Sequence, residues 1–164
     1  MNSRGTEPQP ALPAQAPELA LLEKAIAIAV AAHRGQRDRY GPPYILHPLR
    51  VMGRVETAVE KIVAVLHDVP EDTQWTLADL KREGFPEEVL EALDCLTKRA
   101  GEPYQELVNR SAANPLARRV KLADLEDNLD VRRFGQVGGA EPERLAKYLA
   151  AWQTLTDWEL KIEN

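Results

Sequence analysis

The sequence predicts an all-α protein, a bundle of helices around one core. Apolar residues recur every three to four positions in most segments after residue 18, and this period places them on one face of a helix. Several of these segments open with a helix-capping residue or a proline, as at Thr57, Thr76 and Pro115. No segment shows the alternation of apolar and polar residues that is typical of a half-buried strand.

Length and charge limit the class of protein. A chain of 164 residues is expected to fold as one domain with one core. Its net charge of −5 at pH 7 gives no support for binding to a nucleic acid polymer or an anionic membrane. The single cysteine, Cys95, excludes an internal disulfide and a cysteine-rich zinc site. No signal segment or bilayer-spanning apolar run is present, so we expect a cytoplasmic protein.

The start of the chain differs in composition from the rest. Residues 1–17 carry four prolines among small and polar residues, which predicts a disordered tail, and residues 18–164 form the predicted domain. A helix begins at Glu18 and ends before Gly35. Its inward face carries Leu22, Ile26, Ala29 and His33. His33 is therefore either a core histidine bonded to a neighbour or a metal ligand.

A basic loop and a second histidine follow this helix. Residues 36–43, QRDRYGPP, combine arginines with glycine and proline, a composition typical of loops. Pro48 suits the first turn of a short helix that runs through Met52 and Val55. His47 then lies at the start of that helix, as a cap, a surface residue or a ligand, and spacing alone leaves these alternatives open.

The next helix is expected at the centre of the bundle. Thr57 and Glu60 form a capping-box pattern at its start. The residues that follow are apolar nearly all round the helix, which indicates burial on every side. Pro70 disfavours helical geometry at the residue before it, so the helix should end just after the His67-Asp68 pair.

Four ionisable residues gather at the end of this central helix. They are His67, Asp68, Glu71 and Asp72. Buried charge of this density is costly unless it binds something, and a metal ion meets that requirement.

Three shorter helices are predicted next: one from Thr76 to near Gly84, one that starts at Pro86 and ends in a basic turn, and one from Pro103 to about Ala112. The first opens with a capping box formed by Thr76 and Asp79, and the other two open with prolines. A basic turn that contains Lys98 and Arg99 separates the last two helices.

The helix after Asn114-Pro115 carries two distinct faces. An apolar stripe consists of Leu122, Leu125 and Leu129. A polar stripe consists of Lys121, Asp124 and Asn128. The polar stripe is either a solvated face or part of a site, and periodicity leaves both interpretations open.

A final helix begins at Pro142. Its predicted buried face carries Leu145, Leu149, Trp152 and Leu155. Arg144 and Tyr148 lie one turn apart beside that face. Trp152 and Trp158 serve either the core or the interface of a homodimer.

The ionisable residues form a ligand set without thiolates. Two imidazoles and two carboxylates suit Mn²⁺, Fe²⁺, Co²⁺ or Zn²⁺. The ligands would have to converge from separate helices and leave positions for water and substrate. Basic residues around such a site neutralise phosphate oxygens, and several segments of the chain carry them.

Three blocks of sequence carry a resemblance to a known family. The blocks are HRGQRDRYGPPYILHP, VAVLHDVPEDT and VKLADLEDN, in this order. Together they resemble the HD-domain metal-dependent phosphohydrolases, and within these the hydrolase domain of the RelA/SpoT type and the small alarmone hydrolases. The resemblance covers about residues 18–160. It implies an all-α HD-domain bundle with a metal site at its centre.

The resemblance implies a role for each matched residue. The metal ligands would be His47, His67, Asp68 and Asp124, around a single ion that is usually Mn²⁺. Glu71 and Asp72 would orient the attacking water and handle protons, and His33 would only pack beside the ligands. The candidate substrate contacts are Arg37, Arg39, Lys98, Arg99, Asn128, Arg144 and Tyr148.

Two features depart from the family pattern. The proven alarmone hydrolases tend to carry two adjacent basic residues after the Gln-Arg of the first block, where this chain has Asp38 and Arg39. Pro70, between the two acidic motifs, is also unusual and is expected to stiffen that turn.

The expected function is hydrolysis of a small nucleotide. The first hypothesis is removal of pyrophosphate from the ribose 3′ side of (p)ppGpp, or of phosphate from a related nucleotide such as NADPH, without a synthetase domain. One alternative, which Asp38 keeps open, is a nucleoside monophosphate phosphatase or phosphodiesterase of the wider HD group. Another is a non-catalytic nucleotide-binding module with a structural metal, although Glu71 and Asp72 argue against it.

Overall fold

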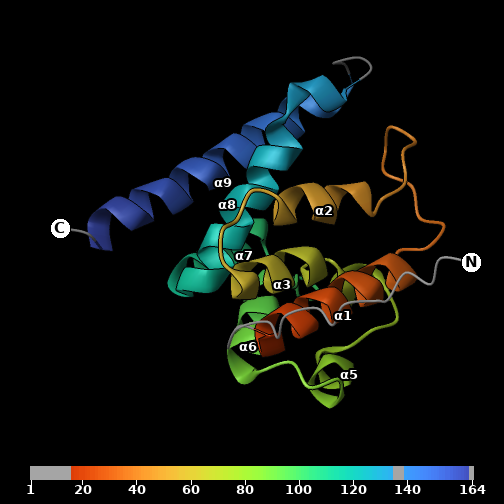
Figure 1. Ribbon diagram of the computed structural model, residues 1–164. Coiled ribbons are helices and arrows are strands. Elements are labelled where there is room, and N and C mark those ends of the chain that lie inside the picture. The colour runs from red at the N-terminus through yellow and green to blue at the C-terminus, as the bar shows by residue number, and fades with distance from the viewer. Residues whose placement is uncertain (1–15, 135–138, 163–164) are drawn as a thin grey trace, which may run out of the picture.

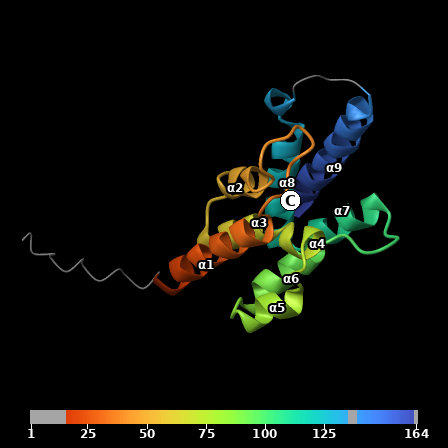
Figure 2. The same cartoon turned by 90° about the vertical axis from the view of Figure 1, so that its right-hand side faces the viewer.

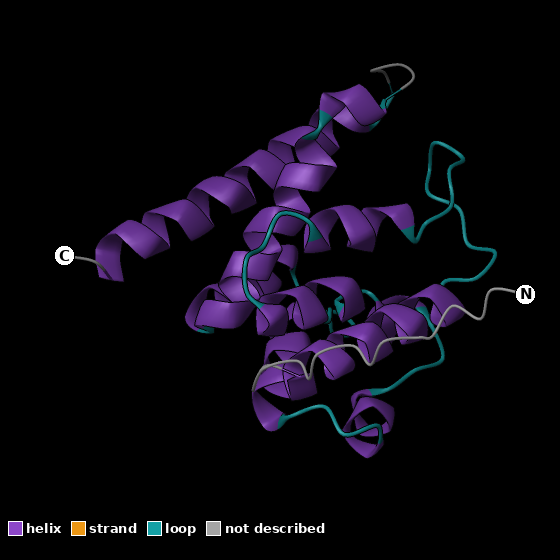
Figure 3. Cartoon of the chain, viewed as in Figure 1, coloured by secondary structure: helices purple, strands orange, loops and turns teal. Residues whose placement is uncertain are grey.

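The computed structural model describes residues 16–134 and 139–162. Within these residues the chain forms helices and no strand, so the predicted all-α fold is confirmed (Figures 1 and 3). In chain order the helices are α1 (Ala16–Ala32), α2 (Leu46–Met52), α3 (Ala58–Leu66), α4 (Val69–Asp72), α5 (Leu77–Arg82), α6 (Glu87–Leu96), α7 (Tyr104–Ala113), α8 (Pro115–Leu129), the 3₁₀ turn η1 (Val131–Arg133) and α9 (Glu141–Ile162). None of them has both the length and the apolar character needed to cross a bilayer.

Helix α3 is the central element, as its sequence predicts. The Thr57 side chain accepts a bond from the Glu60 N–H at 3.2 Å, and the Glu60 carboxylate accepts the Thr57 N–H at 2.9 Å. Residues 62–66 are at most 1% exposed. Helices α1, α2, α6 and α8 pack around α3, and Figure 1 shows it between α1 and α2.

Helix α8 joins two apolar clusters. The larger cluster contains side chains of α1, α2, α3, α5, α6 and the first half of α8. The smaller cluster is formed by α7, α8 and α9. Ala123 belongs to the larger cluster and Leu125 to the smaller one. Asp124 therefore lies on α8 where the two clusters meet.

The regular α-helix is interrupted at His67 and Asp68, although both residues keep right-handed helical dihedral angles. Helix α3 ends at Leu66 and α4 begins at Val69 (Figure 2). Pro70 has no N–H to donate to the carbonyl four residues earlier, so α3 cannot continue through it. In the first turn of α4 an N–H at position 70 would have no acceptor within the helix, so its absence does not destabilise α4. Helix α3 thus ends before the His67-Asp68 pair, whereas the sequence predicts its end just after that pair, and the one-turn helix α4 was not predicted.

Some details of the predicted elements differ from the structure. Leu149, which is predicted to be buried, is 48% exposed in the structure, whereas Ala151 is buried. The face of α9 that carries Tyr148 points inward. Leu149 follows Tyr148 directly, so its side chain lies about 100° further round the helix, away from that inward face. Val55 is buried, but it lies beyond the end of α2.

The predicted tail lies mostly outside the described residues. Ala16 and Pro17, which were assigned to it, already belong to α1. Trp152 is partly buried against the smaller apolar cluster, and Trp158 is 39% exposed.

Candidate metal centre

The four predicted ligands come from separate elements and meet at one point. His47 lies on α2, His67 and Asp68 lie at the break between α3 and α4, and Asp124 lies on α8. His47 Nε2 is 3.1 Å from Asp124 Oδ1 and 3.6 Å from Asp68 Oδ2. His67 Nε2 is 3.1 Å from Asp68 Oδ2 and 3.7 Å from Asp124 Oδ1. The ligand atoms of His47, His67 and Asp124 all lie within 4.8 Å of one another, so that one ion could contact all three, and Asp68 Oδ2 lies beside both imidazoles.

Both histidines direct the same nitrogen toward the centre. His47 Nδ1 bonds to Asp127 Oδ2 at 2.7 Å, and His67 Nδ1 bonds to the Ala64 carbonyl at 2.7 Å. Bonds of this kind place the imidazole proton on Nδ1 and leave the Nε2 lone pair for a metal. His67 Nε2 is buried and makes no hydrogen bond within the described residues. An imidazole nitrogen that makes no hydrogen bond and faces two carboxylates is suited to bind a cation.

The imidazoles and carboxylates at the centre shift one another's pKa values. Burial lowers the pKa of His67, but the nearby Asp68 and Asp124 outweigh it and raise the pKa well above 6.5. Burial raises the pKa of Asp124, but Lys121 and the two histidines hold it well below 3.8. The carboxylates therefore favour their ionised form, and a divalent cation that binds here displaces any proton held at Nε2 of the imidazoles.

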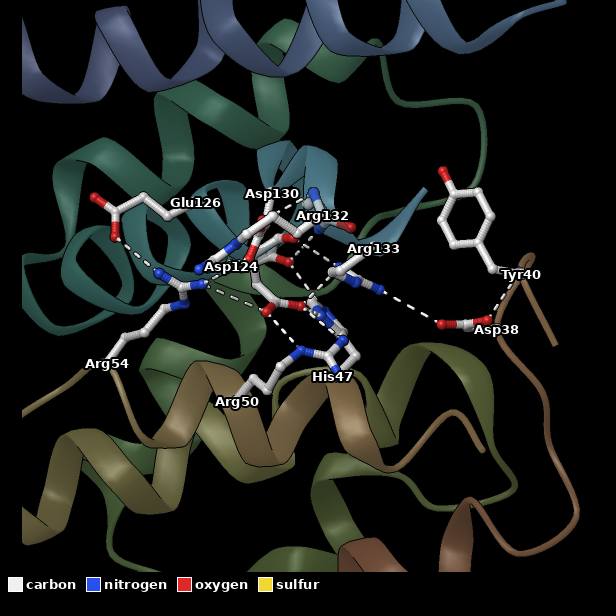
Figure 4. A network of polar contacts seen from close by, with 12 residues as sticks. Asp38, Tyr40, His47, Arg50, Arg54, Asp124, Glu126, Asp130, Arg132 and Arg133 are labelled. Carbon is white, nitrogen blue, oxygen red and sulfur yellow. Dashed lines mark hydrogen bonds and ion pairs between the residues drawn. The ribbon is translucent and has the colours of Figure 1, made fainter. Parts of the chain in front are cut away.

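A buried network supports His47 from the side opposite the centre. Asp127 is 0% exposed and accepts bonds from Arg50 Nε at 2.8 Å and Arg133 Nη1 at 2.7 Å. Arg133 Nη2 also lies 3.6 Å from Asp38 Oδ2 in the basic loop. Figure 4 shows Arg133 between His47 and Asp38. A chain of contacts thus joins the loop to a predicted metal ligand.

The acidic pair of α4 lies beside the ligands. The Tyr44 hydroxyl donates to Asp68 Oδ2 at 2.7 Å and lies 3.3 Å from Asp72 Oδ2. Glu71 Oε2 accepts the Lys98 N–H at 2.9 Å. Burial raises the pKa of Asp72, and the neighbouring charges of Asp68 and Glu71 raise it further. Asp72 is therefore a stronger base than an ordinary carboxylate.

His33 lies outside the group of ligand atoms. Its Nδ1 bonds to Gln36 Oε1 at 2.8 Å, and Gln36 Nε2 donates to the Asp72 carbonyl at 3.0 Å. Its ring centroid is 5.0 Å from that of Tyr44. His33 thus packs behind the acidic pair, in agreement with the interpretation as a core histidine.

A cleft of about 380 Å³ opens onto the ligands and the acidic pair. Six of the seven predicted substrate contacts line it: Arg37, Arg39, Lys98, Asn128, Arg144 and Tyr148. Arg99 does not reach the cleft, because its guanidinium turns outward to Asp94 at 2.9 Å and is 59% exposed. Lys98, the residue before it, does line the cleft.

Comparison with known proteins identifies the family. A scan against protein-family models found no match. The chain is 33% identical over 120 residues to the guanosine-3′,5′-bis(diphosphate) 3′-pyrophosphohydrolase of Aquifex aeolicus, a match that covers 66% of this chain and 17% of the relative. It is also 33% identical over 144 residues to the GTP pyrophosphokinase of Streptomyces coelicolor, with 80% of this chain and 16% of the relative covered.

A solved structure extends the likeness to the whole fold. It belongs to a metazoan ortholog of SpoT that is described as hydrolysing ppGpp. The two folds match with a TM-score of 0.67 and 25% identity, over 94% of this chain and 88% of that one. The chain is an HD domain of the RelA/SpoT hydrolase region. This RelA/SpoT-type HD domain spans about 16% of the length of the curated relatives that it first matches, and those relatives include both hydrolases and pyrophosphokinases by name.

Sequence reasoning missed several side chains at the site of this HD domain. Asp127 lies three residues from Asp124, and a spacing of one helical turn could have indicated it. Lys121 belongs to the predicted polar stripe, in which only Asp124 and Asn128 are assigned a role. Lys121 Nζ lies 2.8 Å from Asp124 Oδ2. Lys147 and Tyr104 also line the cleft, but no local pattern indicates this, because it depends on how α9 packs on α7 and α8.

Proposed function

We propose that this HD domain is a divalent-metal-dependent phosphohydrolase that removes pyrophosphate from the ribose 3′ side of guanosine 3′,5′-bis(diphosphate). The observation that carries the proposal is the convergence of His47, His67, Asp68 and Asp124 beside an acidic pair in a cation-lined cleft. Relatives from Aquifex aeolicus and Vibrio cholerae that are named as this pyrophosphohydrolase support the substrate. We propose that the reaction is hydrolysis of this nucleotide and not pyrophosphate transfer to GTP.

Mn²⁺ is the ion that we propose for the site. The ligand atoms are two imidazole nitrogens and two carboxylate oxygens, a mixed set in which no thiolate selects for a softer metal. When bound, the metal supplies positive charge for the phosphoryl oxygens and lowers the pKa of water. The four side chains hold it and leave the cleft side open to substrate.

The acidic pair performs the proton chemistry in this proposal. Asp72, whose pKa burial and the neighbouring carboxylates raise, accepts a proton from the attacking water. The backbone N–H of Lys98 holds one oxygen of Glu71, and the other oxygen is left to orient that water. Tyr44 fixes the position of Asp72 relative to the ligand Asp68.

The remaining cleft residues bind the nucleotide in this proposal. Asn128, whose amide donates to Asp124 Oδ1 at 2.6 Å, lies close enough to the ligands to contact a ribose held there. Lys98 and Arg144 neutralise phosphate oxygens. Tyr148 offers a ring for stacking.

The structure weakens the case for simple monophosphatase action. That alternative depended on Asp38, an acidic residue at a position where a basic residue would be expected to bind phosphate. The carboxylate of Asp38 accepts the Tyr40 N–H at 2.8 Å and lies 3.6 Å from Arg133 Nη2. Its charge is therefore largely compensated within the protein and does not oppose a phosphate.

Activity against a panel of nucleotides with Mn²⁺ tests the proposed function. The wild type should release pyrophosphate from ppGpp, and Asp68→Ala should lower the rate by more than about a hundredfold, since even residues that only support a ligand account for losses of that order. Asp94→Ala is the matched control, because Asp94 is 49% exposed and lies outside the cleft.

Each contrary result excludes a part of the proposal. Undiminished hydrolysis in Asp68→Ala would remove the metal from the mechanism. Release of orthophosphate alone would indicate a monophosphatase. Tight binding of nucleotides without any turnover would indicate a binding module.

A further inference from the structure

Asp38 shapes the basic loop, residues 36–43, from within. Its backbone N–H donates to the Pro42 carbonyl at 2.9 Å, and its own carbonyl accepts the Gly41 N–H at 3.0 Å. One carboxylate oxygen, Oδ1, accepts the Tyr40 N–H at 2.8 Å, a short-range bond that stabilises turns around aspartate. Gly41 completes the turn at a φ of 99°, which favours glycine. The backbone of the loop is therefore fixed, and Oδ2 of Asp38 is left for a contact outside it.

This second oxygen pairs with Arg133 of η1. Asp38 Oδ2 lies 3.6 Å from Arg133 Nη2, and the two side chains are only 11% and 16% exposed. Arg133 Nη1 donates to the carbonyl and to Oδ2 of Asp127, both at 2.7 Å. A guanidinium is planar and rigid, so it holds acceptors on two sides in a fixed geometry. Figure 4 shows the guanidinium of Arg133 directed at Asp38, and Arg133 thus ties the loop to Asp127.

Arg133 differs from the other arginines at Asp127. Arg50 Nε donates to Asp127 at 2.8 Å, and Arg54 Nη2 lies 3.7 Å from it. In the described part of the chain, Arg133 is the arginine at Asp127 that also pairs with a carboxylate of the loop. Asp127 in turn bonds to Nδ1 of the proposed ligand His47. The loop is therefore connected to the proposed metal centre through Arg133.

The residues on either side of Asp38 line the cleft. They are Arg37 and Arg39. Arg37 Nη1 bonds to the Gly41 carbonyl at 3.4 Å, and Arg39 Nη1 bonds to Glu141 at 2.7 Å. Both side chains project from the backbone that Asp38 fixes, so a contact that restrains Asp38 also restrains where these two cations lie.

We propose that Asp38 and Arg133 are positioning residues that couple the basic loop to the ligand His47. The inference rests on the proposed function, which assigns a metal to His47 and a nucleotide to the cleft. When a metal fixes His47, its bond to Asp127 is fixed as well, and Arg133 carries this restraint to Asp38. By linkage, an ordered loop strengthens metal binding by the factor by which the metal orders the loop. The departure from the family pattern at Asp38 then gives the loop an internal contact in place of a basic residue.

Amide hydrogen exchange in the loop tests the coupling and requires no turnover. The amides of Asp38, Tyr40 and Gly41 report on it, because each donates a bond inside the loop. In the wild type, Mn²⁺ should slow their exchange by at least about fivefold, the lower end of the usual coupling between two sites. Asp38→Asn keeps an oxygen for the Tyr40 N–H but no charge, so the effect of Mn²⁺ should fall below about twofold without the electrostatic pair with Arg133.

Further variants make the result specific. Arg133→Gln should also remove the effect of Mn²⁺ on the loop, and the double variant should lose no more than either single one, since both substitutions break the same series of contacts. Arg133→Lys keeps a cation between the two carboxylates and should retain part of the effect. Asp94→Asn is the matched control, because Asp94 is 49% exposed and lies outside the cleft, and it should behave as the wild type does.

Steady-state kinetics with ppGpp separate positioning from chemistry. Asp38→Asn should raise KM about three- to tenfold and leave kcat within about twofold, the pattern of lost substrate binding without lost chemistry. The loop holds cations that bind the nucleotide, whereas Asp72 and the metal ligands are unchanged. A fall in kcat at an unchanged KM would contradict the positioning role.

The exchange experiment distinguishes a failure of this inference from a failure of the proposed function. An equal effect of Mn²⁺ on the loop in the wild type and in Asp38→Asn would overturn the coupling even where ppGpp is hydrolysed. Faster exchange in Asp38→Asn before Mn²⁺ is added, with an undiminished effect of Mn²⁺ afterwards, would assign Asp38 to the turn alone and overturn it as well. A Mn²⁺ effect that depends on Asp38, in a protein that turns over no nucleotide, would support the coupling and overturn the hydrolase. Failure to bind Mn²⁺ would overturn both.

Discussion

Asp127 holds His47 in place from the side opposite the metal centre. Burial raises the pKa of Asp127, but the bonds from His47 and Arg50 and the charge of Arg133 outweigh it and keep the carboxylate ionised. An ionised partner at Nδ1 orients the imidazole and strengthens it as a ligand through Nε2. We therefore expect Asp127 to strengthen metal binding without touching the metal.

Asp127→Ala should weaken the affinity for Mn²⁺ by about 10- to 100-fold, the usual effect of removing a carboxylate that supports a histidine ligand. Competition with a metal indicator dye measures this affinity directly. Glu126→Ala is the control, since that neighbouring side chain is 48% exposed. Asp127→Asn keeps the size and one acceptor oxygen and should show a smaller loss. Wild-type affinity in a folded Asp127→Ala protein would contradict the role.

The same capping box occurs on two helices that differ in their surroundings. Thr57 and Glu60 cap α3, and Thr76 and Asp79 cap α5. Helix α3 packs against α1, α2, α6 and α8, whereas the main neighbour of α5 is α6. Loss of the cap should therefore affect the whole bundle at α3 and only the local helix at α5.

Thr57→Ala should lower the free energy of unfolding by about 1 kcal/mol, the typical value of an N-cap bond. Thr76→Ala should cost less in global unfolding, because α5 can fray while the rest of the bundle stays folded. Urea denaturation followed by circular dichroism compares the two variants. An equal or larger loss for Thr76→Ala would show that α5 unfolds together with the core.

The metal centre links parts of the molecule that are distant in sequence. Its proposed ligands come from α2, from the break after α3 and from α8, and α8 is shared by the two apolar clusters. A metal that binds only the folded chain must therefore stabilise the whole bundle.

Mn²⁺ at 100 times its Kd should stabilise the fold by about 2.7 kcal/mol, which corresponds to a rise in Tm of roughly 5–10 °C for a domain of this size. Thermal melts with Mn²⁺ and after EDTA treatment measure the shift. The shift should shrink at lower pH, since the raised pKa of His67 lets protons compete with the metal. Asp68→Ala should show no shift, and a wild-type-like shift in this variant would place the metal elsewhere.

The sequence by itself determined the longer helices and the family. Capping boxes, helix-initiating prolines and the break at Pro70 depend on hydrogen bonds within a few residues, and the structure reproduces them. The three motif blocks predicted an HD domain of the RelA/SpoT type, which the comparisons bear out.

Only the tertiary structure decided which side chains meet. It brings His47 beside Asp124 across 77 residues of chain, turns Arg99 outward, exposes Leu149 and places Lys147 in the cleft. The face that a helix presents depends on the helices packed against it, and local periodicity defines that face only to within about one residue, or 100° of rotation. A site built between helices is therefore determined by their packing.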